Sequence, residues 1–469
     1  MDTGYTLKQV LTVAKDHPYY NKDVKYPPSA EDVIRILDTI EKQSDGTSHE
    51  DIDLRSFPLT PKDTLYETIQ RLTADTSSEN TFRHSCYISI TGGGSGGMPM
   101  MFATDAGENR RHRMAAGVLA KTCGLVEPTD FVMSLHSSGK LYRALDLITE
   151  IVENAGGSVL CAGGAMPMPA AKTCAAYYCI NAIAGDGSQV LQFANYIASL
   201  PAEERVGINI KKVIYTSETL SREQRAVIGS ALGQPRILSM LGSAEAGVWG
   251  MSNSELTGEP DDEGMDFIFD TRMMNIEILP TSATDGEPVS IIESLPDGET
   301  GVIVQTSLSR LRNPLVRYIT GDVGNLRPFH CDKTVKNAPS PEDGKYLKVL
   351  RLYGRDRRFS FEWSGEYFEF QHVNALISGS ESWGVIQWQI VLHTMKSKDT
   401  HLEIRLYRSN VDGGESLSDE EIAKELKKYF LVFADNADQF KVTFVSGLDG
   451  FERSSTGAKV MRYVEIKNC

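Results

Sequence analysis

From residue 86 to residue 326, short β-rich runs alternate with longer segments of helical pattern, and this alternation limits the possible folds more than any other feature. The β-rich runs cover residues 87–90, 131–135, 158–161, 212–215 and 236–240, and the helical patterns cover 109–123, 141–154, 188–199 and 221–232. Strands that alternate with helices of this length predict an α/β fold with a largely parallel sheet.

The pattern changes on both sides of this region. Upstream, apolar spacing predicts helices over 30–43 and near 65–72, the first with Ser29 as its N-cap. Beyond about residue 265, short strands separated by turns occur at 266–270, 275–279 and 301–307. These short strands predict an antiparallel or small β-barrel-like subdomain.

The last part of the chain has a pattern of its own. Strands near 401–408 and 441–445 enclose an acidic helical segment near 418–430, which predicts a compact α+β unit. We therefore expect a large N-terminal domain at 1–355 and a small, mobile α+β C-terminal domain at 356–469.

The formal net charge is −15, with a pI near 5.2. A surface this acidic repels phosphate backbones and anionic lipids, so we expect neither nucleic acid nor a membrane surface as the main partner. An anionic nucleotide would have to be bound locally, by backbone amides, helix N-termini, a few cations and Mg²⁺.

The cysteines and the first residues bear on the compartment. There are seven cysteines, an odd number, and none forms a Cys-x-x-Cys pair, so free thiols in a reducing compartment are expected. The first residues are polar, and no stretch approaches the roughly 18 apolar residues that span a bilayer. We expect a soluble, cytoplasmic protein.

The most informative segment is the glycine-rich stretch at 87–100. A β-rich run is followed by a loop with five glycines and two hydroxyl residues, Thr91 and Ser95, and then by a helical pattern from about Asp105. Glycines let backbone amides approach a polyphosphate, and hydroxyl groups add donors. No Gly-Lys-Ser/Thr follows, so this is not a P-loop. Alone, the loop is equally compatible with a flexible turn that binds nothing.

Four further motifs follow this loop in one consistent order, at 214–221, 241–247, 317–322 and 455–462. With them, residues 80–469 resemble the adenylate-forming superfamily of acyl- and aryl-CoA ligases and peptide-synthetase adenylation domains. The nearest branch resembles phenylacetate-CoA ligase. The resemblance implies ATP and Mg²⁺, with CoA as co-substrate.

The resemblance also assigns the nucleotide contacts. It implies that Thr91, Gly93, Gly94, Ser95 and Gly96 contact the triphosphate, and that Ser217, Glu218, Thr219, Leu241, Gly242, Ser243 and Ala244 line the adenine and the phosphates. Leu241 stands where the family has tyrosine, and Ala244 where it has threonine. Glu245 would hold Mg²⁺, a hard cation that takes carboxylate and phosphate oxygens.

The remaining motifs imply the ribose site, the hinge and the catalytic lysine. Asp322 and Arg355 would bind the ribose, and Asp356 is the candidate hinge between two domain orientations. Lys459 lies near the C-terminus, preceded by one extra residue, Ala458. A lysine at this position would stabilise the charge that develops as the α-phosphate is displaced.

The substrate pocket is assigned to His136, Ser137, Tyr177 and Gly242. His136 follows a predicted strand where this family lines its acyl pocket, although a hydrogen-bonded loop histidine is an equal alternative. The pocket would take an aryl or arylacetic acid, and a medium acyl chain is also compatible.

Together these features predict a ligase that converts a carboxylic acid to an acyl-adenylate, releases pyrophosphate and transfers the acyl group to CoA. Three alternatives stay open: an amine acceptor in secondary metabolism, a carrier-protein acceptor, and a degenerate, non-catalytic nucleotide-binding member. The oligomeric state is open too, with a homodimer as one option.

Overall fold

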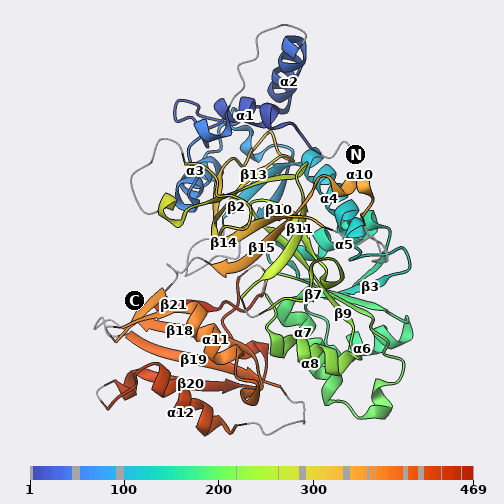
Figure 1. The fold of residues 1–469 in the computed structure, drawn as a ribbon, viewed down its shortest axis with the longest axis vertical. Coiled ribbons are helices and arrows are strands. Elements are labelled where there is room, and N and C mark those ends of the chain that lie inside the picture. The colour runs from blue at the N-terminus through green and yellow to red at the C-terminus, as the bar shows by residue number, and fades with distance from the viewer. Residues whose placement is uncertain are drawn as a thin grey trace.

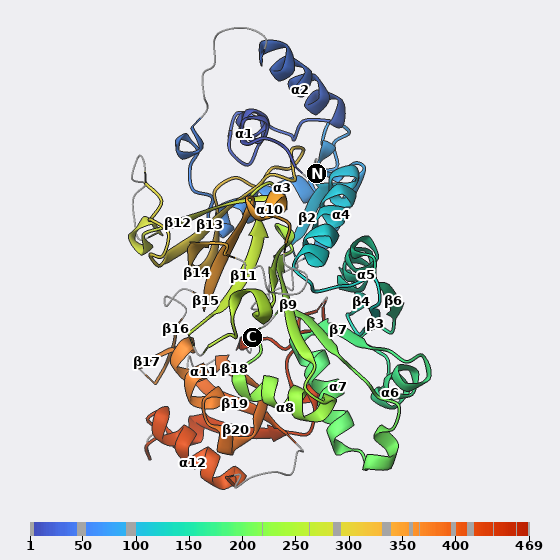
Figure 2. The ribbon, with the colours of Figure 1, turned by 45° about the vertical axis from the view of Figure 1, so that its right-hand side comes forward.

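The computed structural model places the N-terminal helices at one end of an elongated molecule and the C-terminal strands at the other (Figures 1 and 2). It describes residues 4–44, 53–90, 100–217, 219–261, 263–284, 292–330, 339–355, 360–364, 366–394, 400–409, 417–434, 436–455 and 457–467. Between the two ends lies one large mixed sheet.

Within those ranges the large sheet has eleven strands. In spatial order they are β12 (Met274–Leu279), β13 (Gly301–Ser307), β14 (Tyr318–Pro328), β15 (Leu347–Arg355), β11 (Met265–Asp270), β10 (Gly247–Ser252), β9 (Arg236–Ser243), β8 (Lys212–Thr216), β7 (Ala182–Asp186), β3 (Phe131–Ser134) and β6 (Ser158–Cys161). Strands β6, β3, β7, β8 and β9 pair in parallel, and the others pair antiparallel.

The predicted α/β class is therefore confirmed. The antiparallel strands expected beyond residue 265 are present, but they do not form a separate small barrel. Strand β10 pairs with both β9 and β11, so the antiparallel strands continue the parallel sheet.

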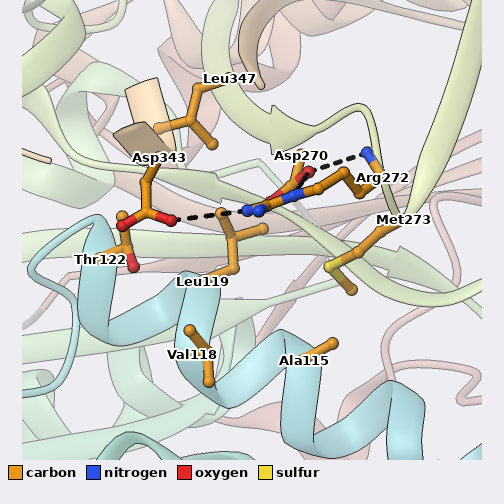
Figure 3. Close-up of a pocket in the computed structure, with 9 residues that line it drawn as sticks. All are labelled: Ala115, Val118, Leu119, Thr122, Asp270, Arg272, Met273, Asp343 and Leu347. Carbon is orange, nitrogen blue, oxygen red and sulfur yellow. Dashed lines mark hydrogen bonds and ion pairs between the residues drawn. The ribbon is translucent and has the colours of Figure 1, made fainter. Parts of the chain in front are cut away.

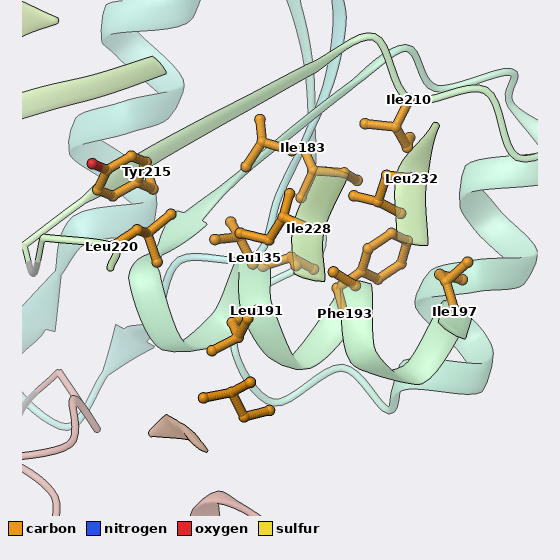
Figure 4. Packing of buried hydrophobic residues seen from close by; sticks show 14 of the residues in the cluster. Leu135, Ile183, Leu191, Phe193, Ile197, Ile210, Tyr215, Leu220, Ile228 and Leu232 are labelled. Atoms are coloured by element: carbon orange, nitrogen blue, oxygen red, sulfur yellow. The ribbon is translucent and has the colours of Figure 1, made fainter. Parts of the chain in front are cut away.

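Helices cover both faces of the parallel part. They are α4 (Ala106–Thr122) and α5 (Ala144–Ala155) on one face, and α6 (Met168–Tyr177), α7 (Gly187–Ser199) and α8 (Arg222–Leu232) on the other. Successive strand residues point to opposite faces, so in β8 Val213 and Tyr215 pack with α7 and α8, and Ile214 packs with α4 and α5. Figure 4 shows Tyr215 in the same cluster as Phe193 of α7 and Ile228 of α8. In the described part of the chain, no helix combines the length and apolar character needed to cross a membrane.

The N-terminal segment forms a helical cap over the antiparallel end of the sheet. Its elements are α1 (Leu7–Lys15), α2 (Ala30–Ser44), α3 (Lys62–Ala74) and the antiparallel pair β1 (Cys86–Ile90) and β2 (Met101–Asp105). The predicted N-cap of α2 is confirmed, because the Ser29 hydroxyl accepts a hydrogen bond from the backbone N–H of Asp32 at 3.1 Å.

The C-terminal segment has its own sheets and core. Its elements are the hairpin β16 (Ser360–Trp363) and β17 (Glu366–Glu369), helices α11 (Phe370–Ser378) and α12 (Asp419–Tyr429), and the four-stranded sheet β20 (Phe440–Val445), β19 (Thr400–Arg408), β18 (Val385–Thr394) and β21 (Tyr463–Lys467). Trp363 and Phe430 are among its fully buried side chains. The large sheet ends at Arg355, and the predicted boundary at 355/356 lies between it and β16.

The C-terminal sheet packs against α7 and α8 (Figure 2). The Asn195 side chain on α7 donates a hydrogen bond to the Tyr407 hydroxyl on β19 at 2.8 Å, and both atoms are buried. Leu448, Phe451 and Val460 join the hydrophobic core beneath α7. Buried polar pairs of this kind favour one orientation of the C-terminal sheet relative to α7 and α8, because a shift of the sheet would leave buried donors and acceptors without partners.

One carboxyl is buried where the N-terminal segment meets α4. Glu108 is 4% exposed and accepts hydrogen bonds from the backbone N–H groups of Leu311 (3.0 Å) and Arg312 (3.4 Å) and from the Tyr5 hydroxyl (3.4 Å). All three bonds go to Oε1; within the described residues, Oε2 has no hydrogen-bond partner. Burial raises the pKa of Glu108 from 4.5 to about 7, because the backbone bonds only partly offset the lost hydration.

Replacing Glu108 with glutamine is expected to flatten the pH dependence of stability. A raised pKa stabilises the fold below the unfolded pKa, and this contribution is lost as pH rises from about 4.5 through about 7. The shift corresponds to about 3 kcal/mol at 1.36 kcal/mol per unit. Urea unfolding midpoints at pH 5 and pH 8 measure this pH-dependent stability. Between pH 5 and pH 8 the wild type should lose more stability than Glu108→Gln, and the control Glu203→Gln, at an exposed position, should lose as much as the wild type. Parallel profiles for wild type and Glu108→Gln would contradict the assignment.

Candidate active site

The parallel strands end at one edge of the large sheet, and most of the predicted site residues that the structure describes lie there. The register aligns Ser134 with Ala184, Asp186 with Thr216, and Thr216 with Met240. The residues just beyond these strands are thereby neighbours: His136 follows β3, Ser217 follows β8, and Gly242 and Ser243 end β9. In open α/β sheets this carboxyl edge is where ligands bind.

Glu245 occupies the tight turn between β9 and β10. The Ser243 hydroxyl accepts a hydrogen bond from the Ala246 backbone N–H at 3.1 Å and closes the turn. Gly247 has φ +75°, and a Cβ atom there would lie 2.1 Å from the buried ring of His112 on α4. Only glycine fits this position, so the turn is fixed over α4.

Glu245 is 5% exposed, and donors surround its carboxylate. Its Oε1 accepts hydrogen bonds from the Tyr66 hydroxyl (3.0 Å) and the Tyr318 hydroxyl (3.1 Å), and the Lys62 ammonium lies 3.7 Å away. Burial is the largest influence on its pKa and raises it. The Lys62 ammonium, a backbone amide and neighbouring hydroxyls together outweigh burial, so the pKa of Glu245 lies below its ordinary value and the group is ionised at neutral pH.

Tyr318 is held in place by a buried ion pair. The guanidinium of its neighbour Arg317, 3% exposed, donates to both oxygens of the Glu277 carboxylate at 3.0 and 3.1 Å and to the Phe57 carbonyl at 2.9 Å. Arg310, also buried, donates to the carbonyl of Glu245 itself. Backbone and side chain of Glu245 are thus both fixed from outside the turn.

The two predicted ribose ligands lie on neighbouring strands. Asp322 on β14 is directly opposite Arg355 on β15, and the Asp322 backbone N–H donates to the Thr320 hydroxyl at 3.1 Å. Asp322 and Arg355 are therefore cross-strand neighbours in the large sheet. The side chain of Arg355 lies outside the described part.

His136 is buried between two hydroxyl groups. Its Nδ1 lies 3.1 Å from the Ser134 hydroxyl, and its Nε2 lies 3.0 Å from the Thr216 hydroxyl. Burial, reinforced by the charge of Lys459, lowers the pKa of His136 from 6.5 to about 3, so the ring is neutral at physiological pH. The next residue, Ser137, accepts a hydrogen bond from the Gln189 side chain at 3.1 Å.

Lys459 reaches this edge from the C-terminal segment. Its backbone N–H donates to the Ser454 hydroxyl at 3.2 Å, and its carbonyl accepts from the Ser454 N–H at 2.8 Å. Ala458, which precedes the lysine, has φ +53° and is therefore in a left-handed conformation. The Lys459 ammonium lies 5.1 Å from the ring centroid of Tyr142, on the short hairpin β4 (Ser138–Gly139) and β5 (Tyr142–Arg143) that follows His136.

Several predicted residues lie outside the described part: Thr91, Gly93, Gly94, Ser95, Gly96, Glu218 and Asp356. The strand before the glycine loop is described, and its Ser89 hydroxyl donates to the Ala244 carbonyl at 2.9 Å. Strand β1, which ends at Ile90, therefore lies beside the Glu245 turn. After β8, Ser217 has φ +81° and its hydroxyl lies 3.1 Å from that of Thr216, which also contacts His136.

Two other predicted residues are near the turn. Leu241 is half-buried between two hydrophobic cores, where its side chain packs. A Cβ atom on Gly242 would lie 2.5 Å from the Gly247 carbonyl, so the backbones of β9 and β10 touch there.

The assignment of Tyr177 to the pocket wall is corrected. Tyr177 ends α6, shortly before β7 begins, so it lies at the amino edge of the parallel strands, opposite His136. Its side chain is 78% exposed, and its ring contacts Tyr178. The aromatic composition of this segment belongs to the surface end of a helix, which sequence alone did not distinguish from a pocket wall.

Sequence reasoning missed Lys62, Tyr66, Thr216 and Tyr142 as parts of the site. Tyr66 and Glu245 are 179 residues apart, so no local pattern connects them. Lys62 and Tyr66 are one helical turn apart on α3, but the helix predicted near 65–72 did not include Lys62, so the sequence did not pair them.

A small hollow lies elsewhere, between α4 and the β11–β12 turn, beside α10 (Pro341–Gly344) (Figure 3). Arg272 forms ion pairs with Asp270 at 2.5 Å and Asp343 at 3.7 Å there, next to apolar side chains such as Leu119. None of its lining residues belongs to the carboxyl edge, so the hollow is not the candidate site.

Among the described residues, no three His, Cys, Asp or Glu side chains lie close enough together to hold a metal ion. A magnesium ion carried by a nucleotide needs only one or two carboxylates, with phosphate and water completing its shell. The ionised Glu245 carboxylate fits that lesser requirement.

Three comparisons relate the chain to known proteins. No family model matches the chain. The indoleacetate–lysine synthetase of Pseudomonas savastanoi is 26% identical over 245 residues, 52% of this chain and 54% of that protein, so the chain matches only about half the length of this curated relative.

Solved structures match over almost the whole chain. 2-Hydroxyisobutyryl-CoA ligase in the postadenylation state, in complex with 2-HIB-AMP, superposes with a TM-score of 0.62 at 16% identity, covering 97% of this chain and 87% of that one. The same ligase in the thioesterification state gives 0.53, at 16% identity over 98% and 87%. The expected adenylate-forming fold is thereby confirmed, and the phenylacetate-CoA ligase branch stays a prediction.

The contact between Gly247 and His112 predicts an unequal effect of two glycine substitutions. Gly233 has φ +79°, and among the described residues no heavy atom would lie within 4 Å of a Cβ atom there, so Gly233→Ala should cost only the left-handed penalty of about 1–2 kcal/mol. Gly247→Ala should cost about 1–3 kcal/mol more, because the methyl group overlaps the His112 ring. Thermal unfolding of both variants measures the difference in stability. Equal losses of stability would contradict the prediction, because they would show that the His112 ring moves aside at no cost.

Proposed function

Because the chain has the fold of the adenylate-forming ligases, we propose that it uses ATP to activate a carboxylic acid as an acyl-adenylate. The observation that carries the proposal is the convergence, at one edge of the sheet, of an ionised buried carboxylate on the β9–β10 turn and a lysine from the C-terminal segment. A negative group on the β9–β10 turn and a positive group from the C-terminal segment suit a reaction between an anionic acid and a metal-bound triphosphate.

In the proposed reaction, a carboxylate oxygen of the acid attacks the α-phosphorus of MgATP. A bond forms between that oxygen and the phosphorus, and the bond from the phosphorus to the bridging oxygen breaks, releasing pyrophosphate. The acid is already ionised at neutral pH, so no general base is required. The protein contributes positioning and charge stabilisation.

The residues have separate roles in this proposal. Glu245 binds the magnesium ion of the nucleotide, and Asp322 and Arg355 hold the ribose. Lys459 stabilises the negative charge on the reacting oxygens. Thr91 and the glycine loop hold the triphosphate, Ser217 to Thr219 and Leu241 to Ala244 line the adenine and phosphates, and Asp356 is the hinge.

The acid is proposed to bind beside His136, with Ser137 and Gly242 in the pocket wall. Since His136 is neutral and hydrogen-bonded on both ring nitrogens, it does not neutralise the carboxylate. That role falls to Lys459. An aryl or arylacetic acid is the favoured class, and the relative whose name specifies indoleacetate, an arylacetic acid, supports it.

The first-choice acceptor is CoA, whose sulfur attacks the acyl carbon of the adenylate and displaces AMP, with the thiol proton passing to solvent. A second candidate is an amine, which would give an amide with the same leaving group. The observation that favours it is the similarity to a synthetase whose name specifies lysine.

Replacement of Lys459 by alanine should abolish most acid-dependent pyrophosphate release while leaving ATP binding measurable. Loss of one preorganised charge at the reacting oxygens typically costs about 10²–10³-fold in rate. The assay uses MgATP with indole-3-acetate, phenylacetate, benzoate and 2-hydroxyisobutyrate, each with CoA, with lysine or with neither.

Lys424→Ala, on the exposed face of α12, is the matched control and should keep the wild-type rate. A thioester or amide identified by mass spectrometry separates the two acceptors. Wild-type protein that binds ATP but releases no pyrophosphate with any acid of a widened panel would contradict the proposal.

A further inference from the structure

The hairpin that follows His136 carries an aromatic ring that lies against the proposed catalytic lysine segment. Tyr142 on β5 is half-buried, and the Lys459 ammonium lies 5.1 Å from its ring centroid. This is within the roughly 6 Å at which a cation is attracted to an aromatic face. The contact joins the large sheet's carboxyl edge to the C-terminal segment.

A second contact shows that the ring and the lysine segment are closely fitted. A Cβ atom built on Gly457 would lie 2.9 Å from two carbons of the Tyr142 ring. Real Cβ atoms do not approach so closely, so any side chain at Gly457 would displace the ring. Two residues of the segment, Gly457 and Lys459, thus meet the same aromatic ring.

The hairpin that carries the Tyr142 ring is held in place by its turn and by contacts of Arg143. Lys140 and Leu141, at the hairpin tip, both have positive φ (49° and 69°), the geometry of a tight two-residue turn. Arg143, next to Tyr142, stacks over Tyr87 of β1 at 4.4 Å and pairs with Asp146 at 2.9 Å. The hairpin is therefore anchored to the strand that leads into the glycine loop.

We propose that Tyr142 is a positioning residue that holds Lys459 at the carboxyl edge for adenylation, and this rests on the proposed function. The ring attracts the ammonium group and packs against Gly457, so it orients the lysine without touching the substrate. Because Lys459, the residue that the ring contacts, acts on the oxygens that react at the α-phosphorus, Tyr142 serves the first half-reaction.

The test compares Tyr142→Leu, which removes the aromatic face, with Tyr142→Phe, which keeps it. In Tyr142→Leu, kcat for acid-dependent pyrophosphate release should fall about 2- to 30-fold with little change in the KM for ATP. Tyr142→Phe should restore most of the rate. Acyl transfer from synthetic acyl-adenylate to the acceptor should change less than twofold in both. Tyr178→Leu, on the surface end of α6, is the matched control.

A double-mutant cycle tests the packing contact. Gly457→Ala should slow pyrophosphate release in the wild-type background and cost less in Tyr142→Leu, where no ring is displaced. Additive effects, equal losses in Tyr142→Phe and Tyr142→Leu, or equal losses in both half-reactions would overturn the proposal.

A readout without turnover keeps this inference separate from the proposed function. Reductive methylation of Lys459, followed by mass spectrometry, should be several-fold faster in Tyr142→Leu than in wild type or Tyr142→Phe. Unchanged labelling would overturn the inference even in an active enzyme. Faster labelling in a protein that activates no acid would leave the contact supported and the proposed function refuted.

Discussion

The carboxylate of Glu245 is the point at which three distant parts of the chain meet. Tyr66 comes from the N-terminal helix α3, Tyr318 from the antiparallel half of the sheet, and Glu245 from the turn between the parallel and antiparallel halves. A buried carboxylate without these donors would lose its charge. The N-terminal segment is thus part of the proposed nucleotide site, and its assembly depends on the folded sheet.

The same edge of the sheet is completed from the opposite end of the chain. Asn195 and Tyr407 form a buried hydrogen bond between α7 and β19, and Val460 enters the core beneath α7. These contacts set Lys459 beside His136 and Tyr142. The described arrangement therefore suits the first, adenylating half of the proposed reaction.

Local features of the fold could be read from the sequence. The helix after the glycine loop begins where expected, because Asp105 caps it by accepting from two backbone N–H groups. Strand β7 (Ala182–Asp186) was missed, because a central strand buried on both faces can consist of alanine, isoleucine and glycine without β-branched alternation. Helix α6 was missed for a similar reason: its alanine-rich sequence has little amphipathic pattern.

For the site, motifs identified residue types but not their surroundings. Glu245 was found from its neighbours in sequence, whereas Tyr66 and Lys62, which contact its carboxylate, lie far away in the chain. Tyr177 was misplaced because composition does not tell which edge of a sheet a helix end reaches. The contacts of Glu245 and the sheet edge at which Tyr177 lies are both set by pairing between segments far apart in the chain. That pairing exists only in the assembled sheet.

The most direct test of the central claim follows the oxygen atoms. An acid that supports pyrophosphate release is prepared with ¹⁸O in both carboxylate oxygens and turned over with MgATP and its acceptor, and the AMP is analysed by mass spectrometry. Attack of the carboxylate on the α-phosphorus predicts one ¹⁸O atom in each AMP. Unlabelled AMP, or ADP with ¹⁸O in inorganic phosphate, would contradict an acyl-adenylate intermediate.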